Sequence, residues 1–145
     1  MASTALVFDE AMYNIGNGLI DLDSHTFKAV LTNTAPVQDT SALLADITQI
    51  ANGNGYLTGG VTLSGVTWAE TGAGTGIWQW TASDFSWTAS GGSIATFRYV
   101  VIYSDTSTGD ALLLYVDYGT TLVITDGNTF YVDVQAAGLA RFTVS

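Results

Sequence analysis

The chain has 145 residues, a usual length for one domain, and its thirteen acidic and three basic residues give a net charge of −10. It contains no cysteine, which excludes disulfides, thiolate zinc sites and cysteine nucleophiles. Only Lys28, Arg98 and Arg141 could neutralise phosphates, so we expect no direct binding to nucleic acid.

No targeting or membrane segment is visible in the sequence. The first residues, "MASTALVFDEAMYN", lack a basic region and a long apolar run, so we expect no signal peptide. No window approaches the roughly 20 apolar residues of a membrane span, so we expect no membrane partner. Charged residues make up 11% of the chain, against about 25% in ordinary domains. A surface rich in Thr, Ser, Gly and Asn suits packing against other protein.

Two short helices are expected in the N-terminal part of the chain. The first covers residues 4–13, and the glycines of "NIGNG" end it at residues 14–18. The second lies in "TSALLADITQI", residues 40–50, where apolar side chains recur at helical spacing. Between the two helices, residues 26–32 alternate apolar and polar side chains, which predicts a strand.

The stretch "ANGNGYLTGG", residues 51–60, places four glycines within eight residues. Gly53, Gly55 and Gly59 come close to a dinucleotide fingerprint, which needs a strand before the glycines and a helix after them. Here a helix-like segment precedes the glycines and the strand-like "VTLSGVTW" follows, and no Lys-Ser or Lys-Thr pair marks a P-loop. The stretch therefore predicts a backbone corner with residues at positive φ, and not a phosphate site.

From residue 60 onward the chain consists of strand-like segments and turns. The segments are rich in Val, Ile, Thr and aromatic residues: "GVTLSGVTW", "GIWQWTAS", "DFSWTAS", "SIATFRYVVIY", "ALLLYVDYG", "TTLVIT", "TFYVDVQ" and "LARFTVS". Their short spacing leaves little room for crossover helices, which favours antiparallel pairing. We predict a mainly β fold: an antiparallel, jelly-roll-like β-sandwich with one or two short helices near the N-terminus. No internal repeat or linker is present, so residues 1–145 form one domain.

The sequence shows no arrangement typical of an enzyme. His25 is the single histidine, and Asp21 and Asp23 are its neighbours in a turn, so we interpret it as a surface residue and not as a general base. Glu10 and Glu70 are the only glutamates, and nothing singles out a carboxylate pair for glycoside hydrolysis. We therefore expect no catalytic residue.

Two acidic turns offer oxygen ligands at short spacing. They are "DLDSH", residues 21–25, and "DTSTGD", residues 105–110. Both lack the alternating acids and the distal glutamate of a calcium loop, and Asp, Ser, Thr and Gly are ordinary turn residues. We expect no metal site and no cofactor; an incidental cation site is the alternative.

Trp78 and Trp80 lie two residues apart in "GIWQWTA", so on a strand both rings project from one face. Three interpretations stay open. The rings fill the core together with other aromatic residues, anchor a subunit interface, or stack on the sugar rings of a glycan.

The N-terminus carries an uncharged apolar run. Leu6, Val7 and Phe8 lie next to one another before the first acidic residue, and such a run would be poorly solvated if free. We therefore expect residues 1–8 to form an assembly arm that docks on a neighbouring protein.

Most of the chain, residues 18–119, resembles small virion proteins of tailed bacteriophages. The resemblance lies in "GLIDLDSHTFKAVLTNTAPV", "DITQIANGNGYLTGGVTL" and "DFSWTASGGSIATFRYVVIYSDTSTGDALLLYVDYG". Its recurring parts are the extended "TFKAVLTN" strand, the "GNGY…GG" corner, the long "FRYVVIY" strand and the "DALLLYVDYG" strand after it. Such proteins look like capsid decoration (cement) proteins, which sit on the outer head as β-sandwich oligomers, commonly trimers. The resemblance supplies no functional residue.

The resemblance implies a non-enzymatic structural protein that is made in the host cytoplasm and located on the capsid surface of the virion. Its partners would be the major capsid protein and further copies of itself, most simply in a homotrimer. Similar sequences also carry tail or head-fibre labels, so the alternative function is a receptor- or glycan-binding module of a tail or head fibre. The exposure of Trp78 and Trp80 discriminates between these two functions.

Overall fold

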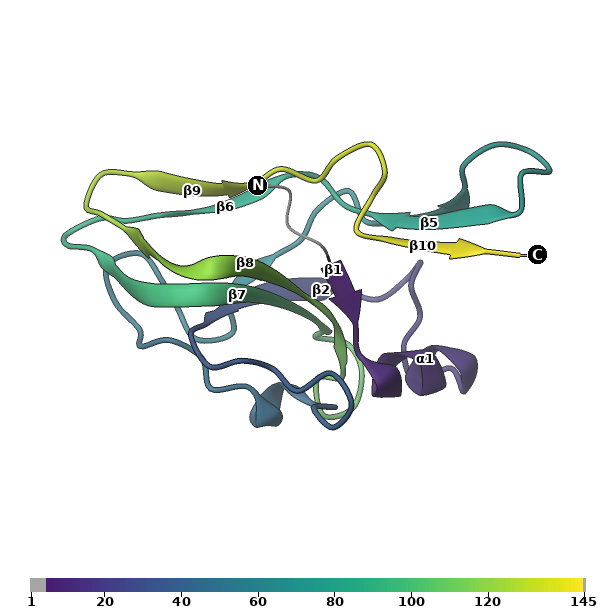
Figure 1. The fold of residues 1–145 in the computed structure, drawn as a ribbon, viewed down its shortest axis with the longest axis horizontal. Coiled ribbons are helices and arrows are strands. Elements are labelled where there is room, and N and C mark those ends of the chain that lie inside the picture. Colours follow the sequence, from purple (N-terminus) through teal and green to yellow (C-terminus); the bar gives the residue numbers. More distant parts are fainter. Residues whose placement is uncertain (1–4, 145) are drawn as a thin grey trace.

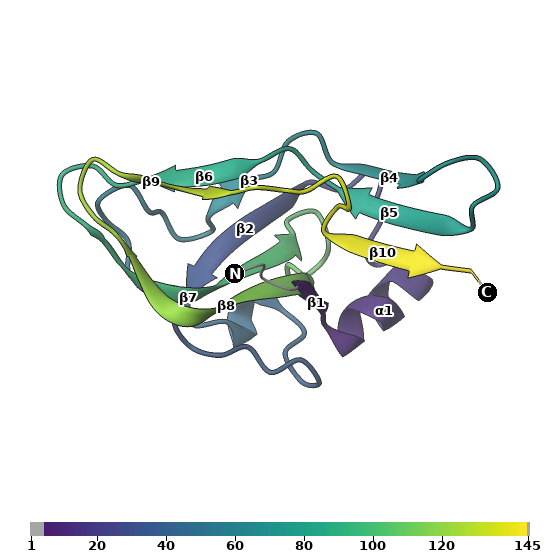
Figure 2. The same cartoon turned by 45° about the horizontal axis from the view of Figure 1, so that its top comes forward.

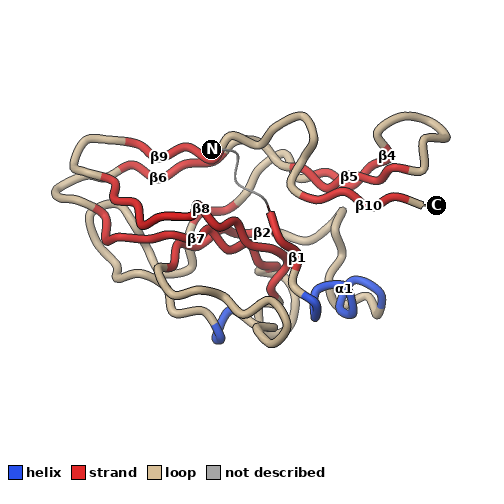
Figure 3. Tube along the Cα trace, in the orientation of Figure 1, coloured by secondary structure: helices blue, strands red, loops and turns tan. Residues whose placement is uncertain are grey.

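The computed structural model describes residues 5–144 of the chain. In chain order its elements are β1 (Ala5–Val7), α1 (Asp9–Gly16), β2 (Phe27–Thr32), a 3₁₀-helix (Leu44–Asp46), β3 (Val61–Thr62), β4 (Thr67–Glu70), β5 (Ile77–Thr81), β6 (Phe85–Thr88), β7 (Ile94–Ser104), β8 (Leu112–Ile124), β9 (Thr129–Val132) and β10 (Ala140–Thr143). Figure 3 shows much more strand than helix along the trace. The prediction of a mainly β fold is confirmed.

The strands form three antiparallel sheets. The largest has the order β1-β8-β7-β2-β3, the second has the order β10-β5-β4, and the third pairs β6 with β9. Figure 1 shows the two smaller sheets in one layer above β2, β7 and β8. On the opposite side lie α1 and the long connection between β2 and β3, which Figure 2 shows from a second direction.

The central strands of the large sheet are covered on both faces. Residues 99–103 of β7 and 112–116 of β8 are all buried, and they read as continuous apolar runs without polar alternation. Such runs are typical of strands with protein on both sides. In the layer above, Trp80 packs edge-on against Phe27 of β2 with ring centroids 4.9 Å apart. The core therefore holds the three-stranded sheet firmly at its β5 strand.

The first helix differs from its expected position over residues 4–13. Residues 5–7 form the edge strand β1, and α1 begins only at Asp9. Phe8 is fully buried, which fixes the chain at this point. Gln38 then connects strand and helix, because its side-chain amide donates to the Val7 carbonyl at 2.8 Å and its own carbonyl accepts from the Asp9 N–H at 3.2 Å. Tertiary contacts therefore decide where the helix starts.

The second expected helix, over residues 40–50, is reduced to the three residues of the 3₁₀-helix. Single bridges pair Leu43 with Ala111 and Gln49 with Thr32 on its two sides. These bridges to neighbouring strands hold the segment extended, so its apolar spacing does not produce an α-helix.

Two strand boundaries also differ from the sequence prediction. "GVTLSGVTW" forms two strands, β3 and β4, that belong to different sheets. "ALLLYVDYG" and "TTLVIT" form one strand of thirteen residues, β8, which passes through Gly119 at a φ of 76°. Glycine tolerates this positive φ inside a strand, so Gly119 makes β8 irregular without ending it.

The glycine-rich stretch is the predicted backbone corner. Gly53, Gly55, Gly59 and Gly60 all have positive φ, which confirms the prediction. A Cβ atom at Gly60 would overlap the carbonyl group of Ala29 in β2. Glycine is therefore needed here for close passage of one backbone across another.

Candidate binding site

The three-stranded sheet β10-β5-β4 has one aromatic and one polar face. The register pairs Trp80 with Trp68, Trp78 with Phe142, and Gln79 with Arg141. Because side chains alternate along a strand, the four rings share the face that looks toward α1 and β2. The prediction that Trp78 and Trp80 project from one face is confirmed.

Trp80 belongs to the core. Its side chain is fully buried, and its indole N–H donates to the carbonyl of Leu22 at 3.1 Å. Together with its edge-on contact to Phe27, this hydrogen bond satisfies the only polar group of the ring. Trp80 is therefore unable to stack on a ligand.

Trp78 lies at the open end of the same face and is 37% exposed. Its ring stacks on Trp68 with centroids 5.5 Å apart and an interplanar angle of 28°. Phe142 of β10 packs edge-on against Trp68 at 5.4 Å. The three rings make one wall of a groove of about 300 Å³, and the whole lining comprises Met12, Ile15, Leu22, Trp68, Trp78, Phe142 and Val144. We call this feature the aromatic groove.

The aromatic groove is open and uncharged. Met12 on α1 is 48% exposed and Val144 after β10 is 72% exposed. Figures 1 and 2 both place α1 beside β5 and β10 at the same end of the molecule. None of the seven lining residues is charged, in a chain with thirteen acidic residues.

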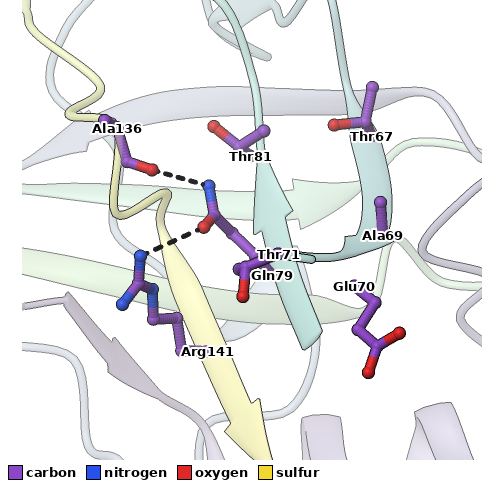
Figure 4. A pocket seen from close by; sticks show the side chains of 8 residues that line it. All are labelled: Thr67, Ala69, Glu70, Thr71, Gln79, Thr81, Ala136 and Arg141. Carbon is purple, nitrogen blue, oxygen red and sulfur yellow. Dashed lines mark hydrogen bonds between the residues drawn. The ribbon is translucent and has the colours of Figure 1, made fainter. Parts of the chain in front are cut away.

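The polar face of the sheet carries a second hollow of about 360 Å³, shown in Figure 4. The Arg141 guanidinium donates to the Gln79 side-chain oxygen at 3.3 Å and to the Ala137 carbonyl at 3.0 Å. The Gln79 amide in turn donates to the Ala136 carbonyl at 2.9 Å. These groups bind the connection between β9 and β10 to the sheet, so their contacts are structural.

Glu70 also lines this hollow but serves the turn between β4 and β5. Its carboxylate accepts the N–H groups of Gly74 at 3.2 Å and Gly76 at 2.8 Å. In Figure 4 its side chain points away from Arg141 and Gln79. No second carboxylate lines the hollow, so it offers no acid pair among the residues that the structure describes.

The described part of the expected assembly arm packs on its own chain. Leu6 pairs with Tyr115 in the β1–β8 ladder and is 36% exposed. Val7 is half-buried, and Phe8 is fully buried against the Tyr115 ring at a centroid distance of 5.0 Å. Residues 1–4 of the expected arm lie outside the described part of the chain.

His25 meets a residue that sequence reasoning missed. Its Nδ1 lies 2.8 Å from the Ser104 hydroxyl at the end of β7, 79 residues away. Ser104 is fully buried and also accepts the Ser107 N–H, so its oxygen cannot reach a substrate. The Asp21 carboxylate accepts from the Ser24 hydroxyl, which is the first cause that lowers its pKa. The contact between His25 and Ser104 therefore fastens the turn to β7. Because the two residues lie far apart in the sequence, no local sequence pattern predicts this contact.

Lys28 and Arg98 each form an ion pair with one aspartate. Lys28 pairs with Asp105 at 3.2 Å. Arg98 donates to Asp117 at 2.7 and 2.9 Å, and these hydrogen bonds lower the pKa of the Asp117 carboxyl. Over residues 5–144 no three His, Asp or Glu side chains come together as a possible metal site.

Within the described residues, no helix is long and apolar enough to cross a membrane. No family model, curated protein or solved structure matches the chain. What the chain binds therefore has to be inferred from its own surfaces, and the aromatic groove gathers exposed apolar side chains around a hollow.

Proposed function

We propose that this chain is a non-enzymatic structural protein of a tailed-phage virion, which binds the capsid exterior as an oligomer and stabilises the shell. The observation that carries the proposal is the aromatic groove, where Met12, Trp78 and Val144 are exposed together. Contiguous exposed apolar surface marks sites of protein interaction. The resemblance to virion proteins supplies the identity of the partner.

The chemistry of the aromatic groove favours a protein partner. Fully burying a side chain such as Met or Val stabilises a contact by about 1.5–3 kcal/mol. An uncharged lining is desolvated at low cost, because no ion loses its hydration. An apolar side chain or short apolar segment of a capsid subunit would fill such a groove.

The proposed mechanism is mass action on the assembled shell. A protein that binds the capsid lattice, and not its free subunits, shifts the equilibrium toward the lattice. A weak contact at each groove becomes effective when several copies are joined and bind together. Bridging neighbouring capsomers in this way needs no cofactor.

We further propose that the three sheets make a jelly-roll-like β-sandwich, the scaffold expected of such proteins. Support comes from contacts between the layers. Phe130 of β9 packs edge-on against Phe97 of β7 at 5.1 Å and against Tyr118 of β8 at 5.3 Å. Trp80 makes the corresponding contact for the three-stranded sheet.

The glycan-binding alternative is favoured by one observation, the exposed ring of Trp78. A bound sugar needs hydrogen-bonding partners for its hydroxyl groups as well as an aromatic ring, because an unpaired polar group is costly to bury. Apart from indole N–H groups, the side chains of the aromatic groove offer no polar atom. The groove therefore suits an apolar protein contact better than a sugar.

Binding to heads tests the proposal directly. Purified protein is mixed with heads of its phage that lack it, and bound protein is counted after sedimentation. We expect saturation at a fixed number of sites, survival of binding in moderate salt, and higher resistance of the decorated heads to heat. Trp78→Ala should weaken binding, whereas Leu57→Ala, which truncates a 73% exposed side chain on a loop, should not.

Two outcomes of the head-binding experiment would contradict the proposal. Absence of head binding, together with attachment to host cells that Trp78→Ala abolishes, would establish the fibre module instead. Equal loss of head binding in the Trp78 and Leu57 variants would show that the aromatic groove is not the contact.

A further inference from the structure

Strand β10 lies at a free edge of the three-stranded sheet, and its hydrogen-bonding pattern can be read from its register. Val144 donates its N–H to the carbonyl of Gly76 at 2.8 Å, in the register that places Phe142 opposite Trp78. Hydrogen-bonded positions alternate along an antiparallel ladder. The backbone groups of Phe142 therefore point to β5, and those of Arg141 and Thr143 point outward.

The outward groups of β10 have no backbone partner within residues 5–144. Both Arg141 and Thr143 are exposed, and a hollow of about 510 Å³ adjoins the start of the strand at Ala140 and Arg141. An open edge of this kind is a ready template for another strand.

Three of the other free edges, those of β1, β3 and β4, are less suitable for pairing. Within the described residues, strand β1 has three residues and β3 has two. Strand β4 ends in Glu70, in a chain whose net charge of −10 already opposes the approach of a second copy. Strand β10 contains no acidic residue.

We propose that β10 pairs antiparallel with β10 of a second copy of this chain, with Phe142 opposite the partner's Phe142. In this register Arg141 lies opposite the partner's Thr143, so each outward N–H meets an outward carbonyl and four hydrogen bonds form across the two-fold axis. Two three-stranded sheets then become one continuous sheet. The edge is self-complementary, as an isologous contact requires.

The side chains at this edge also fit a second copy. The two Phe142 rings occupy a non-hydrogen-bonded pair, where side chains approach most closely, and they extend the wall formed by Trp68 and Trp78. Lys28 and Arg98 are paired with aspartates, so Arg141 is the basic side chain without an acidic partner among the described residues. The register keeps the two Arg141 side chains from facing each other directly.

This pairing is independent of capsid binding and makes a different prediction from the trimer that the resemblance implies. An isologous contact joins two copies. Light scattering behind a sizing column should therefore give twice the 15.2 kDa mass of the chain. A monomer at every concentration, or a trimer that persists in the variants below, would overturn the pairing without bearing on head binding.

Proline provides the sharpest variant. Thr143→Pro removes an outward N–H and places a ring at the free edge, a position where strands tolerate proline. The dimer dissociation constant should rise roughly tenfold or more, since two hydrogen bonds are lost per dimer. Thr143→Val keeps the N–H and should dimerise like the wild type. Equal dimerisation of the proline variant would contradict the proposal, provided that its circular dichroism shows the native fold.

Cysteine cross-linking tests the register, because the chain has no cysteine of its own. In Phe142→Cys the two sulfurs would face each other across the axis, with Cβ atoms about 4.5–5.5 Å apart, within reach of a disulfide. In Thr143→Cys each sulfur would lie opposite the partner's Arg141 and should cross-link slowly. Faster cross-linking of Thr143→Cys than of Phe142→Cys would exclude this register.

Discussion

Trp78 and Trp80 point to the same side of β5, but their exposed fractions are 37% and 0%. The strand rises about 6.6 Å over two residues, enough to pass from the core between β5 and β2 to the open end beside α1. Trp80 is held by Phe27 and by the Leu22 carbonyl. Trp78 stacks on Trp68 and keeps 37% of its surface exposed.

The difference in exposure between Trp78 and Trp80 predicts that replacing each one by phenylalanine lowers the free energy of unfolding by unequal amounts. Trp80→Phe removes the hydrogen bond to Leu22 and leaves unfilled space in the core, so it should lower the free energy of unfolding by about 1–3 kcal/mol. Trp78→Phe should cost less than about 1 kcal/mol, because the side chain is partly solvated in the native state. Urea unfolding followed by circular dichroism measures both values. Similar losses in the two variants would mean that Trp78 is also a core residue.

Tyr56 and Tyr103 are two residues through which pH acts on stability at the alkaline end. Its hydroxyl accepts the Leu31 N–H and donates to Gln49, and burial raises the pKa of Tyr56 to about 12. Burial, with smaller contributions from Asp105 and Asp110, also raises the pKa of Tyr103 to about 12.

A folded-state pKa above the ordinary tyrosine value of 10 means that the folded state holds its phenolic protons more tightly than the unfolded state. The resulting stability is complete below pH 10 and is lost as the pH rises from about 10 toward 12. Urea midpoints measured across this range should fall. Tyr56→Phe should flatten the fall, whereas Tyr131→Phe, at an exposed position of β9, should not. A midpoint unchanged to pH 12 would contradict the buried state of both tyrosines.

At the scale of elements, the corner at residues 51–60 determines how closely the chain passes over β2. Gly60 has a φ of 72° and lies against the Ala29 carbonyl, whereas Gly59 has a φ of 97° and a Cβ atom there would meet only the Tyr103 hydroxyl, at an ordinary contact distance of 3.9 Å. Both positions require glycine conformations, but only Gly60 lacks room for a side chain.

The two glycines provide a matched pair of alanine variants. Gly59→Ala carries the conformational cost of a positive φ, about 1–3 kcal/mol. Gly60→Ala carries that cost together with displacement of β3 from β2, so its loss of stability should be larger. Thermal unfolding of the two variants measures the difference. If Gly59→Ala proves the more damaging, the close passage over Ala29 does not limit stability.

The elements that the sequence predicted well are those whose residues and local contacts agree. The strand over 26–32 became β2, and the corner glycines all took positive φ. The helix over 40–50 failed because bridges to β2 and to Ala111 hold that segment extended. The run Leu6 to Phe8 became an edge strand and a core residue for the same reason, since its partners lie on β8.

At the scale of the whole molecule, the aromatic groove could not be derived from any single segment. Its walls come from α1, β4, β5 and β10, which are brought together only by the stacking of the three-stranded sheet over the large sheet. The sequence identified Trp78 as a candidate contact but carried no signal for Met12 or Val144. Exposure depends on what neighbouring elements cover, and that is a property of the assembled layers.

The charge of the whole molecule leads to the last prediction. The net charge of −10 is spread over a chain with two ion pairs among its described residues, Lys28–Asp105 and Arg98–Asp117. Repulsion between the remaining carboxylates opposes folding and self-association, and salt screens it. Exposed ion pairs contribute little, so their screening should cost less than the repulsion that is relieved.

Raising sodium chloride from about 0.01 to about 1 M shortens the screening length from about 30 to about 3 Å. The melting temperature and the dimer fraction should both rise over this range. The variant Asp39→Asn with Asp126→Asn, at two exposed positions, begins with less repulsion and should show a smaller rise. A melting temperature that falls with salt would mean that the two ion pairs outweigh the repulsion of the acidic surface. A dimer fraction that falls would mean that Arg141 contacts an acidic partner across the β10 edge, where the proposed register places Thr143.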